Sequence, residues 1–267
     1  MDSVFEVALG PSARGRRVAL LRELTGFDEL GTEGTHPVAA TALIERLLVE
    51  APGALGPTEL STLPLGERDR LVAALHARHF GDRVESVVCC SACGKAFAID
   101  FSLQALLASL SEGTPGERPA GPDEGGFYAF EDGRSFRLPH TGDERAVRGL
   151  STAAAADELL RRCSAGAAST ENASWLPAAM AVVGPVIDLE LPARCSLCRR
   201  EQAVHFDIVS FFLVSLARER SLLLREVHRL AAAYHWGRNE ILGLSRSERR
   251  VYVTLVESER GRSRAKS

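Results

Sequence analysis

Long apolar runs are missing from this chain of 267 residues. No stretch reaches the ~18 consecutive apolar residues that a membrane-spanning helix needs, so we expect no membrane insertion. The first residues are acidic where a secretory signal peptide would carry positive charge. These absences predict a cytoplasmic protein, in which thiols stay reduced and paired cysteines indicate metal binding or redox chemistry rather than disulfides.

The signatures of common enzyme families are also missing. The sequence has no glycine-rich phosphate loop and no Gly-x-Ser-x-Gly elbow, and His228 and His235 do not form a His-Glu-x-x-His motif. His76 and His79 have a helical spacing that suits a metal ion. No acidic partner or third ligand is evident near them, so we expect them on a solvated helix face. Because nothing assembles a nucleophile, a base and an oxyanion donor, the sequence predicts a protein that is not an enzyme.

Lysine is rare, with Lys95 and Lys266 as its only examples among 32 basic residues. The net charge of −3 conceals an uneven distribution, because residues 199–267 hold 14 Lys and Arg against 8 Asp and Glu. A basic C-terminal third can meet nucleic acid or an acidic protein surface. Aromatic side chains for stacking on bases are sparse there, and Glu248 and Glu257 dilute the positive charge. Protein contacts are therefore favoured over nucleic acid.

Cysteine, by contrast, occurs in a repeated pattern. One Cys-x-x-Cys knuckle contains Cys90 and Cys93, and a second contains Cys195 and Cys198, at an offset of 105 residues (195 minus 90). Two residues between cysteines let one tight turn present both thiolates to one ion, and two such turns complete the tetrahedral sulfur shell that zinc prefers. We therefore predict one structural zinc site with these four ligands. Four protein ligands leave no open position, so this zinc would not be catalytic.

Two other interpretations of the knuckles stay open: free buried thiols at strand ends, and a redox dithiol, which the missing βαβ pattern disfavours. Gly94 suits the sharp turn after the first knuckle, whereas the second knuckle has Arg199 at that position. Cys163 is expected to be a small core residue on the apolar face of a helix. Cys89 ends a strand beside Cys90 and is expected to point to the opposite face.

The chain before residue 207 contains two similar successions of segments. Thr25-Gly is followed by a helical segment at Leu43, and Thr141-Gly by one at Leu159, with the same shift of 116 residues in both cases (141 minus 25 and 159 minus 43). Each succession then ends in a Cys-x-x-Cys knuckle, a strand and a helix. We interpret this pattern as an internal duplication.

The predicted fold class is α+β: two related halves of helices and short strands are joined by a four-cysteine, zinc-ribbon-like site and followed by a helical C-terminal region. The predicted parts are an N-terminal half with the first knuckle over 1–110, a flexible linker over 111–126, a related half with the second knuckle over 127–206, a helical region over 207–260 and a disordered tail over 261–267. Hydrophobic periodicity predicts strands over 18–24, 84–88, 127–130, 135–138 and 186–191, and helices over 41–50 and from 65 to Gly81.

The C-terminal region is expected to begin with one long helix over 207–234, along which leucines form an apolar stripe. A short helix over 239–242 follows. Ser245 and Glu248 form a capping box that starts the last helix. The residues of that helix expected to face inward are Val251, Leu255 and Val256.

The same C-terminal residues resemble a known family. The runs 222–236, 240–245 and 249–252 are similar to the baseplate hub assembly chaperones, a baseplate protein family of contractile-tailed phages and contractile injection systems. Members of that family carry Cys-Pro-x-Cys-Gly knuckles, each followed by a strand that ends in Asp or Phe-Asp, as at 206–207 here. The resemblance covers most of the chain. Both knuckles of this chain lack the proline, however, and Arg199 replaces the second glycine.

The resemblance implies a non-enzymatic role in building a contractile tail, with baseplate, hub or spike proteins as partners. It also implies a bacterial cytoplasmic location or association with a phage tail-like particle. The side chains expected to contact a partner are Arg225, His228, Tyr234, Trp236, Arg249 and Arg250. The alternative function is a zinc-ribbon regulator that binds nucleic acid, with phosphate contacts from Arg246, Arg249 and Arg250 of a helix-turn-helix-like unit.

Overall fold

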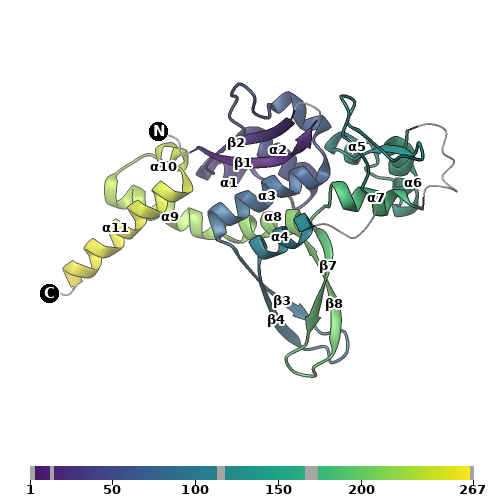
Figure 1. Ribbon diagram of the computed structural model, residues 1–267. Coiled ribbons are helices and arrows are strands. Elements are labelled where there is room, and N and C mark those ends of the chain that lie inside the picture. Colours follow the sequence, from purple (N-terminus) through teal and green to yellow (C-terminus); the bar gives the residue numbers. More distant parts are fainter. Residues whose placement is uncertain (1–3, 13–14, 113–117, 166–173, 265–267) are drawn as a thin grey trace.

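The computed structural model describes residues 4–12, 15–112, 118–165 and 174–264. It is a mixed structure of helices and small antiparallel sheets, as the predicted α+β class requires. In Figure 1 a central body carries three projections: a small helical unit with α5–α7, a C-terminal unit with α9–α11, and a stalk of two β-hairpins. Within the described residues, no helix combines the length and the apolar character that crossing a bilayer would require.

The body is built from the N-terminal elements and α8. Its elements are β1 (Val4–Ser12), β2 (Gly15–Arg22), α1 (Gly26–Gly31), α2 (Pro37–Leu47), η1 (Pro57–Thr62), α3 (Leu65–Phe80) and α8 (Ile208–Arg218). The apolar residues of α2 recur at helical spacing, and Leu43, Ile44 and Leu47 are fully buried. The predicted helix over 41–50 begins earlier, because Pro37 occupies its first turn and the His36 side chain accepts a hydrogen bond from the Ala39 N–H.

The unit with α5–α7 has an aromatic core of its own. Its elements are β5 (Phe127–Ala129), β6 (Ser135–Arg137), α5 (Thr141–Ala146), α6 (Thr152–Cys163) and α7 (Leu176–Val183). Phe136 is fully buried and stacks on Tyr128, while Trp175 meets it edge to face at 5.8 Å between ring centroids. The Arg134 guanidinium lies 4.9 Å from the Trp175 ring centroid, in cation–π contact.

An arginine–aspartate pair stabilises the start of a short helix in each of these two parts. Asp28 of α1 accepts from Arg22 at 2.7 Å and 3.1 Å. Asp143 of α5 accepts from Arg137 at 2.5 Å and 2.9 Å and from the N–H of its capping residue His140. These matching positions are 115 residues apart (143 minus 28). The predicted shift of 116 at the two Thr-Gly pairs is therefore one residue too large here.

Two hairpins of equal size form the stalk. The first pairs β3 (Arg83–Cys89) with β4 (Ala96–Ser102) and leads into α4 (Leu103–Glu112); the second pairs β7 (Asp188–Arg194) with β8 (Glu201–Asp207) and leads into α8. At the base of each hairpin, the first residue of the following helix is hydrogen-bonded to the residue just before the first strand. The Leu103 N–H donates to the Asp82 carbonyl, and the Ile208 N–H donates to the Ile187 carbonyl. Because each strand has seven residues, the Cys-x-x-Cys turns at the hairpin tips lie about 20 Å from that base.

The segment 111–126 differs from the flexible linker that its composition predicted. Helix α4 continues to Glu112, and residues 113–117 lie outside the described residues. Ala120 exchanges two backbone hydrogen bonds with Ala129, so the chain extends the β5–β6 pair. The Asp123 carboxylate accepts the N–H groups of Gly125 and Phe127 at 2.9 Å and 2.8 Å. These bonds give the glycine-rich turn a defined conformation.

The C-terminal region departs from prediction in three places. The expected single helix over 207–234 is two helices, α8 and α9 (Arg220–Tyr234), which meet at Glu219. The next helices are α10 (Arg238–Gly243) and α11 (Arg246–Arg264), so the last helix extends into the expected disordered tail, of which 265–267 lie outside the described residues. Val256 is buried as predicted, but Val251 and Leu255 are 59% and 47% exposed, because they lie on the opposite face of α11.

Contacts in the body join the N-terminal part to the α5–α7 unit, independently of the cysteines. Arg68 of α3 donates to both carboxylate oxygens of Glu144 at 2.8 Å. The neighbouring Asp69 accepts from Arg68 at 2.8 Å and from the Ile187 N–H at 3.0 Å. Arg68 and Asp69 are 5% and 2% exposed, so these bonds are sheltered from water. The base of the second hairpin is therefore fixed to α3.

Gly66 marks another close approach at this junction. A Cβ atom at Gly66 would lie 2.5 Å from the Pro185 carbonyl oxygen and 3.1 Å from that of Gly184. Gly66→Ala is expected to destabilise the protein by about 1–3 kcal/mol in urea denaturation, because backbone must move apart to admit the methyl group. Gly31→Ala is the matched control: no atom lies within 4 Å of its added Cβ. Equal stability of the two variants would contradict this packing.

Candidate metal centre

The four cysteines of the two knuckles lie together at the tips of the hairpins. Their Sγ atoms are all within 4.8 Å of one another. The Sγ atoms of Cys90 and Cys198 are 3.6 Å apart, and those of Cys93 and Cys195 are 3.9 Å apart. Zinc–sulfur bonds of about 2.3 Å in a tetrahedron place sulfurs about 3.8 Å apart, so the cluster has the size of a zinc–tetrathiolate site. The predicted meeting of these cysteines is confirmed; the identity of the metal stays a prediction.

The two knuckles have the same backbone turn. In the first, Gly94 N–H donates to the Cys90 carbonyl at 2.9 Å; in the second, Arg199 N–H donates to the Cys195 carbonyl at the same distance. Gly94 has φ +67° and Arg199 has φ +60°, so both adopt the left-handed conformation. An L-residue other than glycine pays roughly 1–2 kcal/mol for this conformation. The second knuckle therefore keeps the turn with an arginine, although glycine would suit it better.

Backbone N–H groups inside the turns donate hydrogen bonds to the thiols and shift their pKa values. The N–H groups of Cys93 and Ala92 lower the pKa of Cys90 to about 6. The Cys198 N–H lowers the pKa of Cys195 in the same way. At Cys198 the Arg200 N–H acts in that direction, but desolvation and the neighbouring thiols outweigh it and raise the pKa to about 11. A metal ion that binds the four thiols would displace their remaining protons.

The hairpins also contact each other beside the cysteines. The Gln202 side-chain oxygen of β8 accepts from the Ser91 N–H at 2.9 Å and from the Ser91 hydroxyl at 3.1 Å. Phe97 of β4 is 4% exposed and packs with the buried Cys90 and Cys195. Gln202 and Phe97 were missed in the sequence, because only the fold shows that they face the other knuckle. They hold the hairpin tips together around the thiols.

The two remaining cysteines lie outside the cluster. Cys163 is fully buried at the end of α6, and burial raises the pKa of its thiol to about 11. The prediction of a core cysteine is therefore confirmed. Cys89 is exposed at the end of β3 and is not one of the four clustered residues.

The residues expected to contact a partner lie on the C-terminal unit, but they do not form one surface. Tyr234 and Trp236 stack with 4.9 Å between ring centroids and pack around the buried Leu230 and Ile241. The side chains that are exposed are those of Arg225, His228 and Arg250. Arg249 is 1% exposed, so its assignment as a partner-binding residue is wrong.

Arg249 belongs to a buried ion network between α11 and the rest of the protein. Its guanidinium donates to Glu226 of α9 at 2.7 Å and pairs with Glu29 of α1. Arg246 donates to the other oxygen of Glu29 at 2.5 Å and pairs with Glu219. The side chains of Arg246, Arg249 and Glu29 are 3%, 1% and 3% exposed. Two of the three arginines expected as phosphate contacts are thus unavailable to nucleic acid.

His76 and His79 are not on a solvated face, contrary to expectation. His76 is 2% exposed and packs between Phe80 and Phe211, at 5.4 Å and 5.3 Å between ring centroids. Burial, followed by the nearby Arg246, lowers the pKa of His79 to about 4. The Glu23 carboxylate acts in the opposite direction, and Arg78 and Arg250 add to the lowering. His79 is therefore neutral in the folded protein at neutral pH.

This histidine makes stability depend on pH. The folded pKa of His79, about 4, lies below the unfolded value of 6.5, so the folded state favours the neutral imidazole. The contribution of this histidine to the free energy of unfolding is therefore complete above pH 6.5 and is lost as the pH falls towards 4. Between pH 7 and pH 5 the loss amounts to about 2 kcal/mol. In urea denaturation, the free energy of unfolding should therefore fall less between pH 7 and pH 5 for His79→Gln than for the parent protein. The same substitution at the exposed His228 should leave the drop unchanged; equal drops in all three proteins would contradict the assignment.

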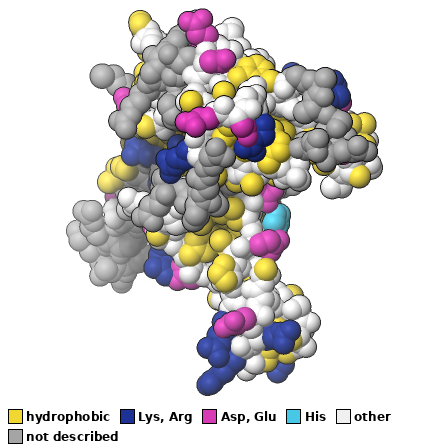
Figure 2. Space-filling model, turned by 45° about the vertical axis from the view of Figure 1, so that its right-hand side comes forward, with side chains coloured by type: hydrophobic (Ala, Val, Ile, Leu, Met, Phe, Trp, Pro, Cys, Tyr) yellow, Lys and Arg dark blue, Asp and Glu magenta, His cyan; other side chains and the backbone are white. Residues whose placement is uncertain are grey.

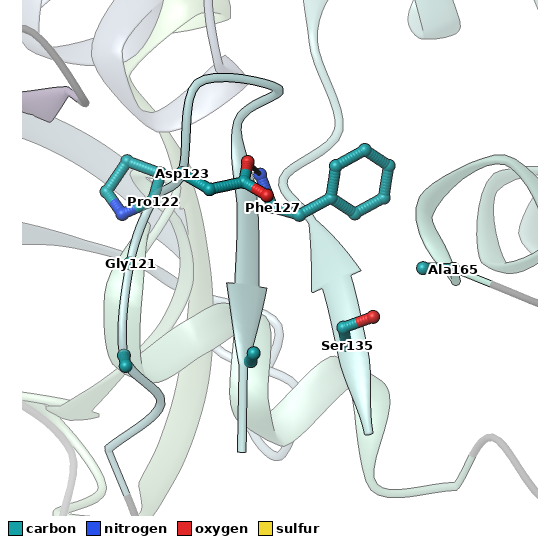
Figure 3. A pocket seen from close by; sticks show the side chains of 8 residues that line it. Gly121, Pro122, Asp123, Phe127, Ser135 and Ala165 are labelled. Atoms are coloured by element: carbon teal, nitrogen blue, oxygen red, sulfur yellow. Dashed lines mark hydrogen bonds between the residues drawn. The ribbon is translucent and has the colours of Figure 1, made fainter. Parts of the chain in front are cut away.

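Two hollows in the described surface contain no comparable cluster. One, of about 520 Å³, lies beside β5 and β6, where Asp123 and Ser135 are among its polar side chains (Figure 3). The Asp123 carboxylate is already bonded to the Gly125 and Phe127 N–H groups. The other, of about 470 Å³, runs between β4 and β7 and is lined largely by apolar side chains. Neither brings together groups suited to catalysis.

Comparison of the chain with protein-family models, with curated proteins and with solved structures finds no match. The metal centre is thus the best-defined chemical site among the described residues.

Proposed function

We propose that this protein is a non-enzymatic assembly or structural component of the baseplate or hub of a contractile phage tail-like injection system, and that a structural zinc ion stabilises it. The four thiols at the meeting point of the two hairpin tips carry the proposal. The four thiols support the zinc part of the proposal. The resemblance of the C-terminal helices and the knuckles to the baseplate family supports the role in a contractile injection system.

The donor set supports a structural metal over a catalytic one. Four thiolates satisfy a tetrahedral zinc ion and leave no position for water or substrate. The hairpins that carry them are supported by the Ser91–Gln202 hydrogen bonds and by Phe97, which orient the turns. Such a site supplies rigidity, and rigidity at the end of a projecting stalk suits a protein that works by contact.

We also propose that the two parts of the chain before residue 207 are related by duplication. The Arg22–Asp28 and Arg137–Asp143 pairs cap corresponding helices 115 residues apart. Two hairpins with the same strand lengths and the same turn hydrogen bonds are 105 residues apart. Both parts therefore present the same succession of hairpin, capped helix and knuckle, which a single ancestral unit explains.

The metal is tested by elemental analysis of the purified full-length protein. About one zinc per chain is expected, with the Cys93→Ser variant falling to near zero. Cys89→Ser is the matched control, because Cys89 is exposed and outside the cluster, and it should retain the ion. A fully folded protein that contains no metal would refute the zinc assignment.

The role in assembly is tested by deletion of the encoding gene. Loss of assembled particles is expected, with restoration by the wild-type copy, together with co-purification of hub, spike or baseplate proteins. Intact and functional particles in the deletion strain would refute the role while leaving the metal assignment standing.

A further inference from the structure

The outer end of the stalk has a surface that neither the metal nor the fold requires. The second knuckle differs from the first at three matching positions: Leu197 replaces Ala92, Arg199 replaces Gly94 and Arg200 replaces Lys95. The backbone hydrogen bonds of the two turns are the same, so these differences leave the backbone turn unchanged. They alter only the side chains that the turn exposes.

Arg199 is the least expected of these residues. It occupies a left-handed position at φ +60°, where the first knuckle has glycine, so the chain sacrifices stability to keep this side chain. Strain of this kind at one of two otherwise equal sites points to a function for the side chain. Among the described residues no hydrogen bond or ion pair engages the Arg199 guanidinium, so its function does not lie within the fold.

The tip as a whole is basic. Its exposed cationic side chains are those of Lys95, Arg194, Arg199 and Arg200, and Glu201 is the acidic side chain in the same two stretches, 90–96 and 194–201. Figure 2 shows Lys and Arg side chains gathered at the lower end of the molecule. A zinc ion with four thiolates would carry a net charge of −2, and the side-chain balance of +3 exceeds it. The tip therefore attracts anionic groups with or without the metal.

An apolar side chain lies within this basic surface. Leu197 is 60% exposed at the apex of the second knuckle, between Ser196 and Cys198. Nucleic acid would use stacking aromatic groups, but the aromatic residue at the tip, Phe97, is 4% exposed and faces the cysteines. A leucine surrounded by arginines instead matches a protein segment in which carboxylates flank an apolar residue.

We infer that the tip of the stalk is a docking surface for an acidic segment of a partner protein, with Leu197 as the apolar anchor and Arg199 and Arg200 as carboxylate contacts. This inference deepens the proposed function, because the tip keeps its shape through the metal centre. This docking surface on the stalk is separate from the C-terminal side chains that the sequence predicted as partner contacts, of which Arg225, His228 and Arg250 are exposed.

Selection from a displayed library of random 12-residue peptides against the zinc-loaded full-length protein tests the inference. Enriched peptides should combine Asp or Glu with Leu, Ile or Phe, and fluorescence anisotropy should show affinity about tenfold lower for Arg199→Gly and for Leu197→Ser. Arg148→Ala removes an exposed arginine of the α5–α7 unit and should leave affinity unchanged. Arg199→Gly should at the same time retain one zinc and leave the Tm unchanged or raise it by about 2–4 °C.

Three outcomes would overturn the inference. The first is enrichment of peptides without acidic residues, or equal affinity of the enriched peptides for the parent and the tip variants. The second is loss of zinc from Arg199→Gly, which would assign the arginine to neutralising the thiolates. The third is binding of a 20-base-pair DNA duplex that depends on Arg199 in the absence of acidic-peptide binding. A parent protein without zinc would instead refute the proposed metal centre, so the two failures are distinguishable.

Discussion

Replacement of Cys195 by serine is expected to abolish zinc binding and to loosen the tip of the stalk, while the body of the protein stays folded. Cys195 is a fully buried member of the cluster, and its sulfur lies 3.9 Å from that of Cys93. Serine offers no thiolate, so three sulfurs remain where a structural zinc needs four ligands. The remaining contacts between the hairpin ends would include the Ser91–Gln202 hydrogen bonds and the packing of Phe97 and its apolar neighbours.

The body should survive this change because its own contacts do not pass through the cysteines. Its core is formed by α2, α3 and α8, with Leu43, Leu71 and Phe212 fully buried. The Arg68–Glu144 pair and the Asp69–Ile187 hydrogen bond fix the α5–α7 unit and the base of the second hairpin. The cysteines lie about 20 Å beyond that base, estimated from the rise of the strands.

Amide hydrogen exchange resolves the two regions. In Cys195→Ser, exchange over residues 88–96 and 193–201 should accelerate by about tenfold or more, whereas the protection of α2 and α3 should be unchanged. Cys89→Ser is the control that should keep both zinc and protection. Global unfolding of Cys195→Ser would show that the metal holds the entire protein together, and an undiminished zinc content would remove Cys195 from the site.

Arg249→Ala is expected to destabilise the protein by about 3–5 kcal/mol, because it leaves the buried Glu226 carboxylate without its close cation and removes one of the two arginines that pair with Glu29. Glu29 and Glu226 are each 5% exposed, and Arg249 donates to Glu226 at 2.7 Å and pairs with Glu29. The same change would also weaken the attachment of α11 to α1, where the Arg246–Glu29 pair would remain. Urea denaturation measures the loss, and fluorescence of Trp236, which lies in the C-terminal unit, reports whether that unit separates first.

An exposed ion pair between the same two helices supplies the control. Arg229 of α9 pairs with Glu257 of α11, with side chains 41% and 56% exposed. Arg229→Ala should change stability by less than about 1 kcal/mol, because water screens the pair. Arg249→Met combined with Glu226→Gln should recover part of the loss, since the unpaired charge is removed with its partner. A loss below about 1 kcal/mol in Arg249→Ala would contradict the network.

The metal centre could be predicted from the sequence because its information is local. A Cys-x-x-Cys turn places two sulfurs on one side of a knuckle wherever it occurs, and two such turns need only meet. The strand over 84–88, which leads into the first knuckle, followed from alternation alone and lies within β3. The supporting contact between Ser91 and Gln202 could not be predicted, because it joins residues 111 positions apart through the arrangement of the hairpins.

The interior of the C-terminal unit could not be predicted for a related reason. Arginine is usually a surface residue, so the sequence predicts Arg246 and Arg249 at the surface, whereas the fold places Glu29 against both of them. The break at Glu219 has no proline or glycine to announce it. It lies where Glu219 receives Arg246 and Arg250 from α11, so a tertiary contact and not local propensity locates it. The helical spacing of Arg249, Val253 and Val256 was the available signal: Arg249 and Val256 are buried and Val253 is half-buried.

The first knuckle leaves the ribosome long before the second. At about 5–20 residues per second, synthesis of the intervening 105 residues takes roughly 5–20 s. During that interval the nascent chain offers a metal ion only two of the four sulfurs, and α5–α7 are made before the other two appear. The proposed zinc ion would therefore gain its four ligands only after the second knuckle is made, and a chain with a truncated or misfolded second part would lack the complete site.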